Sequence, residues 1–315
     1  MISYLEFEKP VAALEARIAE LRQTAEGGDV DLASEIRRLE AKSADLLAAT
    51  YKALTPWQKT QVARHPMRPH FVDYVAQAFT DFMPLGGDRN FGDDQAIIGG
   101  FAKLGERRVM LIGHEKGNDT QTRLKHNFGM GKPEGYRKAI RLMDLAGRFG
   151  LPVVTLVDTS GAFPGLEAEE RGQAEAIARS TEACLGLPVP MVAAIVGEGG
   201  SGGAVALASA ERVLMMEHAV YSVISPEGCA SILWRTNEKA AEAAEAMKVT
   251  AQDLLGLGVI DRIVTEPVGG AHRNPEAAAK SLASAIGEEL DLLGKLSASQ
   301  LQAKREDRFL RIGEG

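Results

Sequence analysis

Two segments of this chain constrain its fold most, because each joins a short apolar run to a glycine-rich stretch that leads into a helix. In the first, the apolar run 152–157 precedes the stretch 158–165, and in the second the run 192–196 precedes 197–204. Short continuous apolar runs are typical of strands that are buried on both faces of a parallel sheet. Their alternation with amphipathic helices along the chain predicts a layered α/β fold.

The glycine-rich stretches also predict a binding site made by the backbone. Glycine lets a ligand approach the main chain closely, and the start of a helix offers unpaired N–H groups with partial positive charge. Such an arrangement suits an anion, a phosphate or a developing oxyanion. Because the chain builds it twice, we expect a functional role beyond tight turns.

Generic motifs in the second stretch leave two alternatives open. Gly197, Gly199 and Gly202 satisfy G-x-G-x-x-G, the dinucleotide-binding pattern of an oxidoreductase, with Glu217 downstream. The same stretch satisfies G-x-S-x-G around Ser201, and Asp261 and His272 follow in the order of a serine hydrolase. Both patterns are easily matched by chance in a segment so dense in glycine.

Composition narrows the functional class. The chain is 45% hydrophobic and 25% charged, as in an ordinary globular protein, and its net charge of -7 argues against nucleic acid as a partner. No apolar run is long enough to span a membrane, and no secretory signal opens the chain. The two cysteines form no C-x-x-C pair, and no histidines have metal-binding spacing, so we expect no metal and a cytoplasmic location. His114, His126 and the basic run from Lys116 to Arg137 suit either a solvated face or an anionic group of a substrate.

Helical periodicity predicts the remaining organisation. Residues 1–50 form a helical hairpin broken at 27–29, residues 51–290 form the α/β domain, and residues 291–315 form a C-terminal helical tail. Thr55 and Pro56 have the residue types of a helix start. Within the domain we expect strands at 96–104, 107–113, 212–216 and 259–264, and helices at 71–82, 133–149, 168–185, 203–210, 247–257 and 274–297.

Longer motifs resemble one protein family. The stretch 158–165 followed by 168–173, the stretch 197–204, and the segment Tyr221 to Trp234 are similar to motifs of the alpha subunit of bacterial acetyl-CoA carboxylase carboxyltransferase. Shorter agreements lie at 64–66, 93–94, 127–130 and 133–139, so the resemblance spans roughly residues 1–290. The chain departs from the family's usual residues at Ser160, Phe163 and His126. Phe163 lacks a hydroxyl group, and His126 stands where arginine is usual, which weakens a phosphate-binding role there.

The resemblance implies a crotonase-like fold of repeated ββα units and a partner beta subunit in an α2β2 core. It implies that a carboxyl group passes from carboxybiotin, delivered by a biotin carboxyl carrier protein, to acetyl-CoA, giving malonyl-CoA for fatty-acid synthesis. Biotin carboxylase would load the carrier, zinc would be bound only by the beta subunit, and no cofactor would be attached to this chain.

Within this resemblance, backbone donors stabilise charge on the biotin ureido oxygen. We assign this role to Gly199 and Gly200, with Gly161 and Ala162 as supports. The carboxybiotin side of the site would be lined by Gly197, Ser201, Gly202, Gly203 and Phe163. Ser201 then begins a helix and is not a nucleophile.

Overall fold

A single twisted sheet organises the protein, as seen in the computed structural model, which describes residues 3–26 and 32–313. The sheet order is β1-β2-β3-β4-β5-β6-β8, and β7 pairs with β5. The first three strands are antiparallel, whereas every later pairing is parallel. The strand bounds are β1 Thr80–Pro84, β2 Ile97–Leu104, β3 Arg107–His114, β4 Val153–Thr159, β5 Met191–Gly200, β6 Arg212–Met216, β7 Val220–Ser222 and β8 Arg262–Val264.

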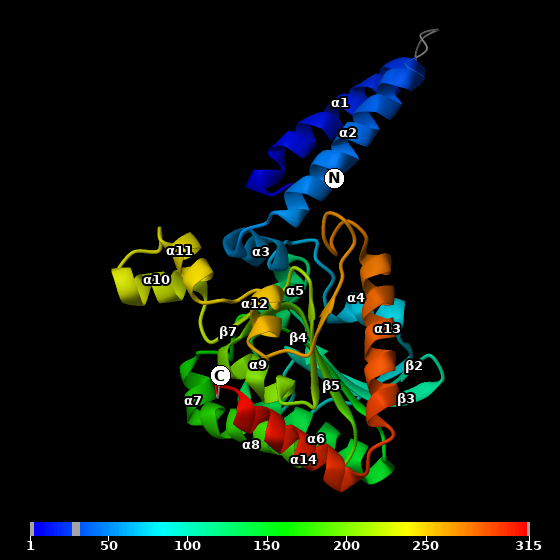
Figure 1. Cartoon of the computed structure of the whole chain (residues 1–315). Helices are drawn as coiled ribbons and strands as arrows, with labels where there is room; N and C mark the ends of the chain where they lie inside the picture. Colours follow the sequence, from blue (N-terminus) through cyan, green and yellow to red (C-terminus); the bar gives the residue numbers. More distant parts are fainter. Residues whose placement is uncertain (1–2, 27–31, 314–315) are drawn as a thin grey trace.

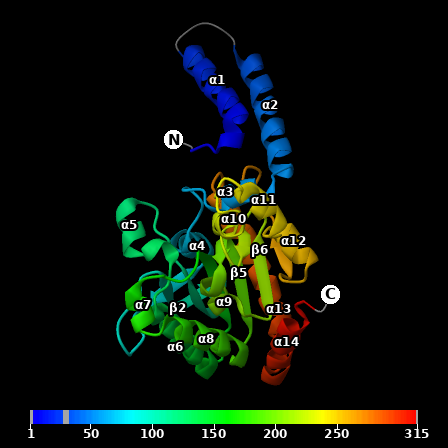
Figure 2. The ribbon, with the colours of Figure 1, turned by 90° about the vertical axis from the view of Figure 1, so that its left-hand side faces the viewer.

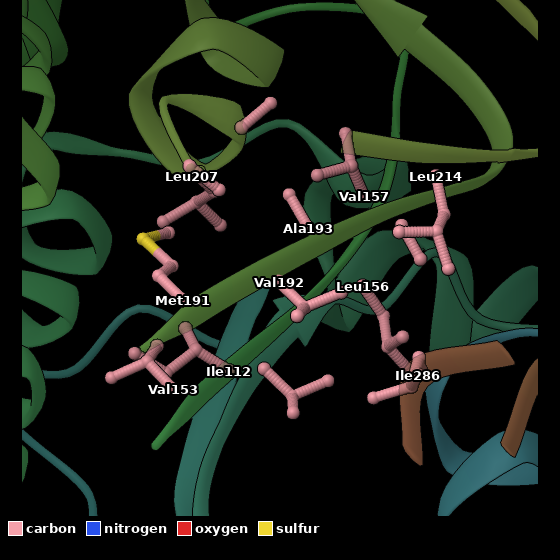
Figure 3. Packing of buried hydrophobic residues seen from close by; sticks show 14 of the residues in the cluster. Ile112, Val153, Leu156, Val157, Met191, Val192, Ala193, Leu207, Leu214 and Ile286 are labelled. Atoms are coloured by element: carbon pink, nitrogen blue, oxygen red, sulfur yellow. The ribbon is translucent and has the colours of Figure 1, made fainter. Parts of the chain in front are cut away.

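Helices cover both faces of the sheet, which confirms the mixed α/β class. On one face lie α6 (Pro133–Phe149), α8 (Gln173–Gly186) and α9 (Ser201–Ala208), and on the other lie α4 (Phe71–Ala78) and α13 (Pro275–Leu293). Figure 3 shows Leu207 of α9 and Ile286 of α13 on opposite sides of the central strands. All ten residues of β5 are buried, as the continuous apolar run predicts.

The N-terminal segment forms the predicted helical hairpin. Helices α1 (Lys9–Glu26) and α2 (Ala33–Lys52) lie side by side and project away from the sheet, as Figures 1 and 2 show. The predicted break at 27–29 lies outside the described residues. At the base of the hairpin, Arg273 forms ion pairs with Glu8 and Glu15, at 3.2 and 2.9 Å, so charged groups tie the hairpin to the body.

The C-terminal helix α14 (Ala298–Arg311) is integrated into the body. Arg305 is completely buried, pairs with Glu211 at 2.9 Å and donates to carbonyl groups at the end of α8, among them Leu185 O at 3.0 Å. The boundary predicted at residue 290 falls inside α13, whose Leu290 and Leu293 belong to the main core. The division into three domains stays a prediction.

Several predicted helices and strands have different bounds in the structure. The helix predicted at 71–82 ends at Ala78 and is followed by β1, because pairing with β2 stabilises the extended conformation there. The helix predicted at 168–185 is divided into α7 (Leu166–Glu170) and α8 by Gly172, whose φ of 77° is left-handed. The helix predicted at 247–257 is reduced to α12 (Ala251–Gly256), which begins after Thr250 as N-cap.

Some elements have the bounds that the sequence predicts, and several short elements were not predicted. Helix α6 has the predicted bounds, and Thr55 caps α3 (Pro56–Ala63) as expected. The sequence missed β7, α5 (Thr120–Lys125), α10 (Pro226–Trp234) and α11 (Ala240–Ala246). The repeated ββα organisation stays a prediction.

Candidate active site

The two glycine-rich stretches meet at the carboxyl edge of the sheet. Thr159, at the end of β4, pairs with Gly199 in β5. A Cβ atom on Gly200 would lie 2.3 Å from the carbonyl carbon of Ser160, and one on Gly203 would lie 2.8 Å from that of Gly161. Since two backbones touch at these positions, only glycine fits there.

The second stretch is not the loop that we expected. Strand β5 continues through the glycines to Gly200, and α9 begins at the next residue, Ser201, whose φ is 51°. Gly199 pairs on one side with Thr159 of β4 and on the other with Tyr221 of β7. Pairing on both sides keeps the chain extended where glycine alone would favour a loop.

The first stretch is an irregular loop fixed by its own hydrogen bonds. The Gly161 N–H donates to Thr159 Oγ1 at 3.1 Å, and the Phe163 N–H donates to Gly131 O at 3.0 Å. The Gln173 side chain donates to Phe163 O at 2.9 Å. Among residues 3–26 and 32–313, no acceptor forms a hydrogen bond with the Ala162 N–H, and a Cβ on Gly203 would lie 2.9 Å from Ala162 N. A free donor from the first stretch therefore lies beside the first turn of α9.

A charged cluster of Asp158, Lys116, Glu198 and Arg64 borders this junction. Buried Asp158 accepts a hydrogen bond from the Glu198 N–H at 2.8 Å and pairs with Lys116 Nζ at 2.7 Å. Burial alone would raise the pKa of Asp158, but Lys116, His70 and the Glu198 N–H hold that pKa below its usual value. Arg64 donates to Glu198 Oε1 from two nitrogens, at 2.6 and 3.0 Å.

The cluster lines a cavity of about 270 Å³ beside the first glycine stretch. Its walls come from the end of α3 and the following turn, from the ends of β3, β4 and β5, and from α5 and the turn after it; they are Ala63, Arg64, His65, Pro66, His70, Lys116, Gly117, Arg123, Phe128, Asp158, Ser160 and Glu198. The sequence did not identify this set, because its members are dispersed along the chain. Glu198 within the glycine motif and Arg64 in the motif at 64–66 were the available signals.

The remaining polar candidates have separate environments. His114 is fully buried, and burial lowers its pKa to about 4, so its ring is neutral at pH 7. His126 Nδ1 lies 2.6 Å from Gln95 O. The basic run does not form one anion site, since Lys132 pairs with Glu167 at 2.7 Å and Arg137 with Glu175 at 3.3 Å.

The hydrolase geometry predicted from G-x-S-x-G is not formed. Asp261 pairs with Arg212 and Arg308, at 3.2 and 2.6 Å, and the His272 ring stacks on His65 with centroids 3.8 Å apart. Neither ring nitrogen of His272 has a hydrogen-bond partner within the described part of the chain. Ser201 therefore has no base of the kind that a catalytic triad requires.

The glycines of the dinucleotide pattern do not form the phosphate-binding loop that the pattern predicts. Gly197 and Gly199 lie in β5, where a Cβ would lie 2.4 Å from Asp158 Oδ1 and 2.8 Å from the Tyr221 ring, respectively. These two glycines serve close packing within the sheet, and they do not approach a pyrophosphate. Among the residues that the structure describes, no cluster of three acidic, histidine or cysteine side chains could hold a metal, and no helix could cross a membrane.

Comparison with known proteins agrees with these observations. A family model described as acetyl co-enzyme A carboxylase carboxyltransferase-like matches residues 4–313. The acetyl-coenzyme A carboxylase carboxyl transferase subunit alpha of Erythrobacter litoralis is 78% identical over 313 residues, which are 99% of this chain and 100% of the relative. The subunit of the same name from Rhizorhabdus wittichii is 74% identical over the same shares of both chains.

Solved structures with low sequence identity share the fold. Transcarboxylase 12S matches with a TM-score of 0.59 at 17% identity, covering 74% of this chain and 44% of its own. A chain of the Pseudomonas malonate decarboxylase hetero-tetramer matches with a TM-score of 0.56 at 20% identity, covering 70% of this chain and 92% of its own. This chain thus spans less than half of the transcarboxylase chain. The family match along almost the whole sequence shows that the chain belongs to the acetyl-coenzyme A carboxylase carboxyl transferase alpha subunits.

Proposed function

We propose that this chain supplies the carboxybiotin half of a site that makes malonyl-CoA from acetyl-CoA. The observation that carries the proposal is the junction of the two glycine stretches, where the Ala162 N–H lies beside the first turn of α9 and the neighbouring Ser160 and Glu198 line a cavity. In the reaction, the bond between the carboxyl carbon and the biotin ureido nitrogen breaks, and CO2 leaves. The electron pair stays on the ureido group, so negative charge develops on its oxygen.

Proton transfer and carbon bond formation complete the reaction. The ureido nitrogen takes a proton from the methyl group of the acetyl thioester, and the resulting enolate carbon forms a bond to CO2. Donors preorganised toward the ureido oxygen lower the barrier, and each contributes on the order of 3 kcal/mol. No nucleophilic side chain is needed, in keeping with the absence of a base beside Ser201 among the described residues.

The donors come from the junction of β5 and α9 together with Ala162. Our sequence-based assignment used Gly199 and Gly200, but Gly199 pairs with Thr159 and with Tyr221, and Gly200 pairs with Ser222. The N–H groups of Ser201, Gly202 and Gly203 lie in the first turn of α9, where no intrahelical acceptor exists. We therefore extend the donor set to this turn, with Gly199 and Gly200 setting where the turn begins.

The charged cluster has a supporting electrostatic role. Asp158 and Glu198 are carboxylates close to the region where an anion would form, and alone they would oppose it. Lys116 lies 2.7 Å from Asp158, and Arg64 lies 2.6 Å from Glu198. The formal charges of these four groups sum to zero, so each carboxylate is offset by a neighbouring cation.

The acyl-CoA half of the site, a zinc site and a second set of donors belong to a beta subunit in an α2β2 complex. The structural neighbours support this proposal, because this chain covers only 44% of the transcarboxylase chain. The biotin carboxyl carrier protein and biotin carboxylase supply carboxybiotin, so no cofactor is attached to this chain. The crotonase-like repeat and the cytoplasmic location belong to the same proposal.

Replacing one backbone donor by an ester oxygen tests this assignment. Ribosomal incorporation of lactic acid at Ala162 removes its N–H and keeps the side chain. In the reconstituted complex, we expect kcat for biotin-dependent malonyl-CoA decarboxylation to fall about 100-fold. The corresponding hydroxy acid at Val268, an exposed loop residue, is the control and should leave kcat within about twofold. An unchanged kcat at position 162, or full activity of this chain without the beta subunit, would contradict the proposal.

A further inference from the structure

Two motifs that carried the family resemblance supply none of the proposed donors, yet the structure joins them to each other. One is the segment at 64–66, and the other runs from Tyr221 to Trp234. Arg64, which caps the C-terminus of α3, reaches Glu227 in the first turn of α10. Its Nη1 donates to Glu227 Oε1 at 2.6 Å.

The same guanidinium group holds the end of β5. Arg64 Nε and Nη2 both donate to Glu198 Oε1, at 3.0 and 2.6 Å. Glu198 directly precedes Gly199, and its own N–H donates to Asp158 at 2.8 Å. Both the backbone and the side chain of Glu198 are thus fixed immediately before the donor junction.

Helix α10 begins shortly after β7, which pairs with the end of β5, and the Arg64–Glu227 ion pair adds a side-chain link from α10 to the same strand end. It packs mainly against α11, which in turn packs on α3, as Figure 1 shows at the edge of the body. Helix α3 ends at Ala63, and Arg64 caps it. The ion pair of Arg64 with Glu227 therefore links the end of α3 directly to α10, in addition to the contacts that both helices make with α11.

We propose that Arg64 is a positioning residue that couples α10 to the Gly199–Gly200 end of β5, and so sets the geometry of the carboxybiotin donors. This inference rests on the proposed function of that junction. Arginine is required because its planar fork bonds two carboxylates in fixed directions, whereas a lysine ammonium group acts as a single point charge. Burial would lower the pKa of Arg64, but Glu198 and Glu227 raise it above its usual value, so the fork stays charged.

The test compares Arg64→Lys, Glu227→Gln and the double variant with a matched control, Arg262→Lys. Arg262 also faces two carboxylates, Glu288 at 2.8 Å and Glu289 at 3.6 Å, but it lies on β8 and does not line the cavity. Each variant is purified in complex with the beta subunit. Its kcat and both KM values are measured for biotin-dependent malonyl-CoA decarboxylation.

We expect Arg64→Lys to lower kcat/KM for biotin about 20-fold and Glu227→Gln to lower it about fourfold, with KM for malonyl-CoA within twofold of wild type. The double variant should resemble Arg64→Lys, because Glu227 acts through Arg64. The control should stay within twofold in every parameter. Glu227→Gln removes only the negative charge of the outer arm and keeps the Arg64–Glu198 contact, so it tests the coupling even if Arg64→Lys fails to assemble.

The inference is overturned if Glu227→Gln matches the control, or if the two single effects multiply in the double variant. A different outcome separates it from the proposed function. The effects of the two substitutions could remain non-additive but change KM for malonyl-CoA instead of kcat/KM for biotin. In that case the coupling stands and the assignment of the junction to carboxybiotin is wrong.

Discussion

The two glycine stretches look alike in sequence, but the structure uses them differently. The first leaves β4 and becomes a loop in which Gly161 has a φ of 147° and no atom lies within 4 Å of the position that its Cβ would take. The second stays in β5 to Gly200 and turns into α9 within one residue. Glycine thus provides an unusual dihedral angle in the first stretch and close backbone contact in the second.

Each stretch is also held by a different buried ion pair. Asp158 at the start of the first pairs with Lys116, whereas Arg68 donates from Nε to Val196 O of β5 at 2.8 Å and pairs with Glu266. Burial would raise the pKa of Glu266, but Arg68 lowers it to about 2. The site therefore combines a loop and a strand end held by two ion pairs, of which the Asp158–Lys116 pair contacts both stretches through the Glu198 N–H.

The largest expected effect tests the close contact in the second stretch. Gly200→Ala places a methyl group 2.3 Å from Ser160 backbone atoms, which no side-chain rotation can relieve. We expect the free energy of unfolding to fall by more than about 4 kcal/mol, measured by urea denaturation. Gly202→Ala is the matched control, because its Cβ would lie at an ordinary 3.4 Å from Ile177. Equal stability of the two variants would refute the contact argument.

A somewhat smaller effect tests the ion pair of the first stretch. Asp158→Asn keeps an acceptor for the Glu198 N–H but leaves Lys116 with Glu198, at 3.9 Å, as its remaining charge partner. We expect a loss of about 3 kcal/mol at pH 7.

The pH dependence of this variant provides its control. The folded-state pKa of Asp158 is depressed, so its contribution is present above the unfolded pKa of about 3.9 and is lost as the pH falls through the folded value. The stability gap between wild type and Asp158→Asn should therefore narrow in urea titrations below about pH 4. A gap that is constant with pH would show that charge is not the cause.

Gly161→Ala probes the dihedral angle of the first stretch. Nothing lies within 4 Å of the added Cβ, so the cost comes from the φ of 147° and is about 1–3 kcal/mol. Relaxation of that angle would reorient the neighbouring Ala162 N–H. We therefore expect a clear loss of kcat in addition to the modest loss of thermal stability. Stopped-flow kinetics and calorimetry of the same preparation separate the two. A loss of stability with unchanged kcat would place Ala162 outside the site.

The smallest expected effect is that of Ser201→Ala. The side chain is exposed, and no base bonds it in the described part of the chain, so activity should stay within about twofold. Ser201→Gly should raise stability by about 0.5 kcal/mol, because glycine adopts a φ of 51° without strain. A large loss of activity in Ser201→Ala would revive the hydrolase alternative.

The sequence was sufficient to predict the elements whose structure depends on interactions between residues close together in the chain. The bounds of α6 and the capping of α3 by Thr55 follow from periodicity and helix-start residues. The hairpin of β2 and β3 was predicted within a residue or so at each end. β1 and β7 were missed because their extended conformation depends on pairing with distant strands.

The site shows the same division. The glycine stretches are evident in the sequence, and Ala162 was among the predicted residues, but the free or paired state of each N–H was not accessible. The sequence also does not reveal that a side chain at position 200 would damage the junction itself, because the conflict is with the backbone of Ser160. Arg64 and Glu198 are 134 positions apart, so no local pattern links them.

The sequence by itself determined the family, the alternation of strands and helices, and the presence of two glycine-rich strand ends. These features depend on residue type and short-range spacing. Only the tertiary structure decided which glycines pack, which N–H groups remain free and how Arg64 connects β5 to α10. The physical reason is that hydrogen bonds, ion pairs and backbone contacts act over a few ångströms in space, between residues far apart along the chain.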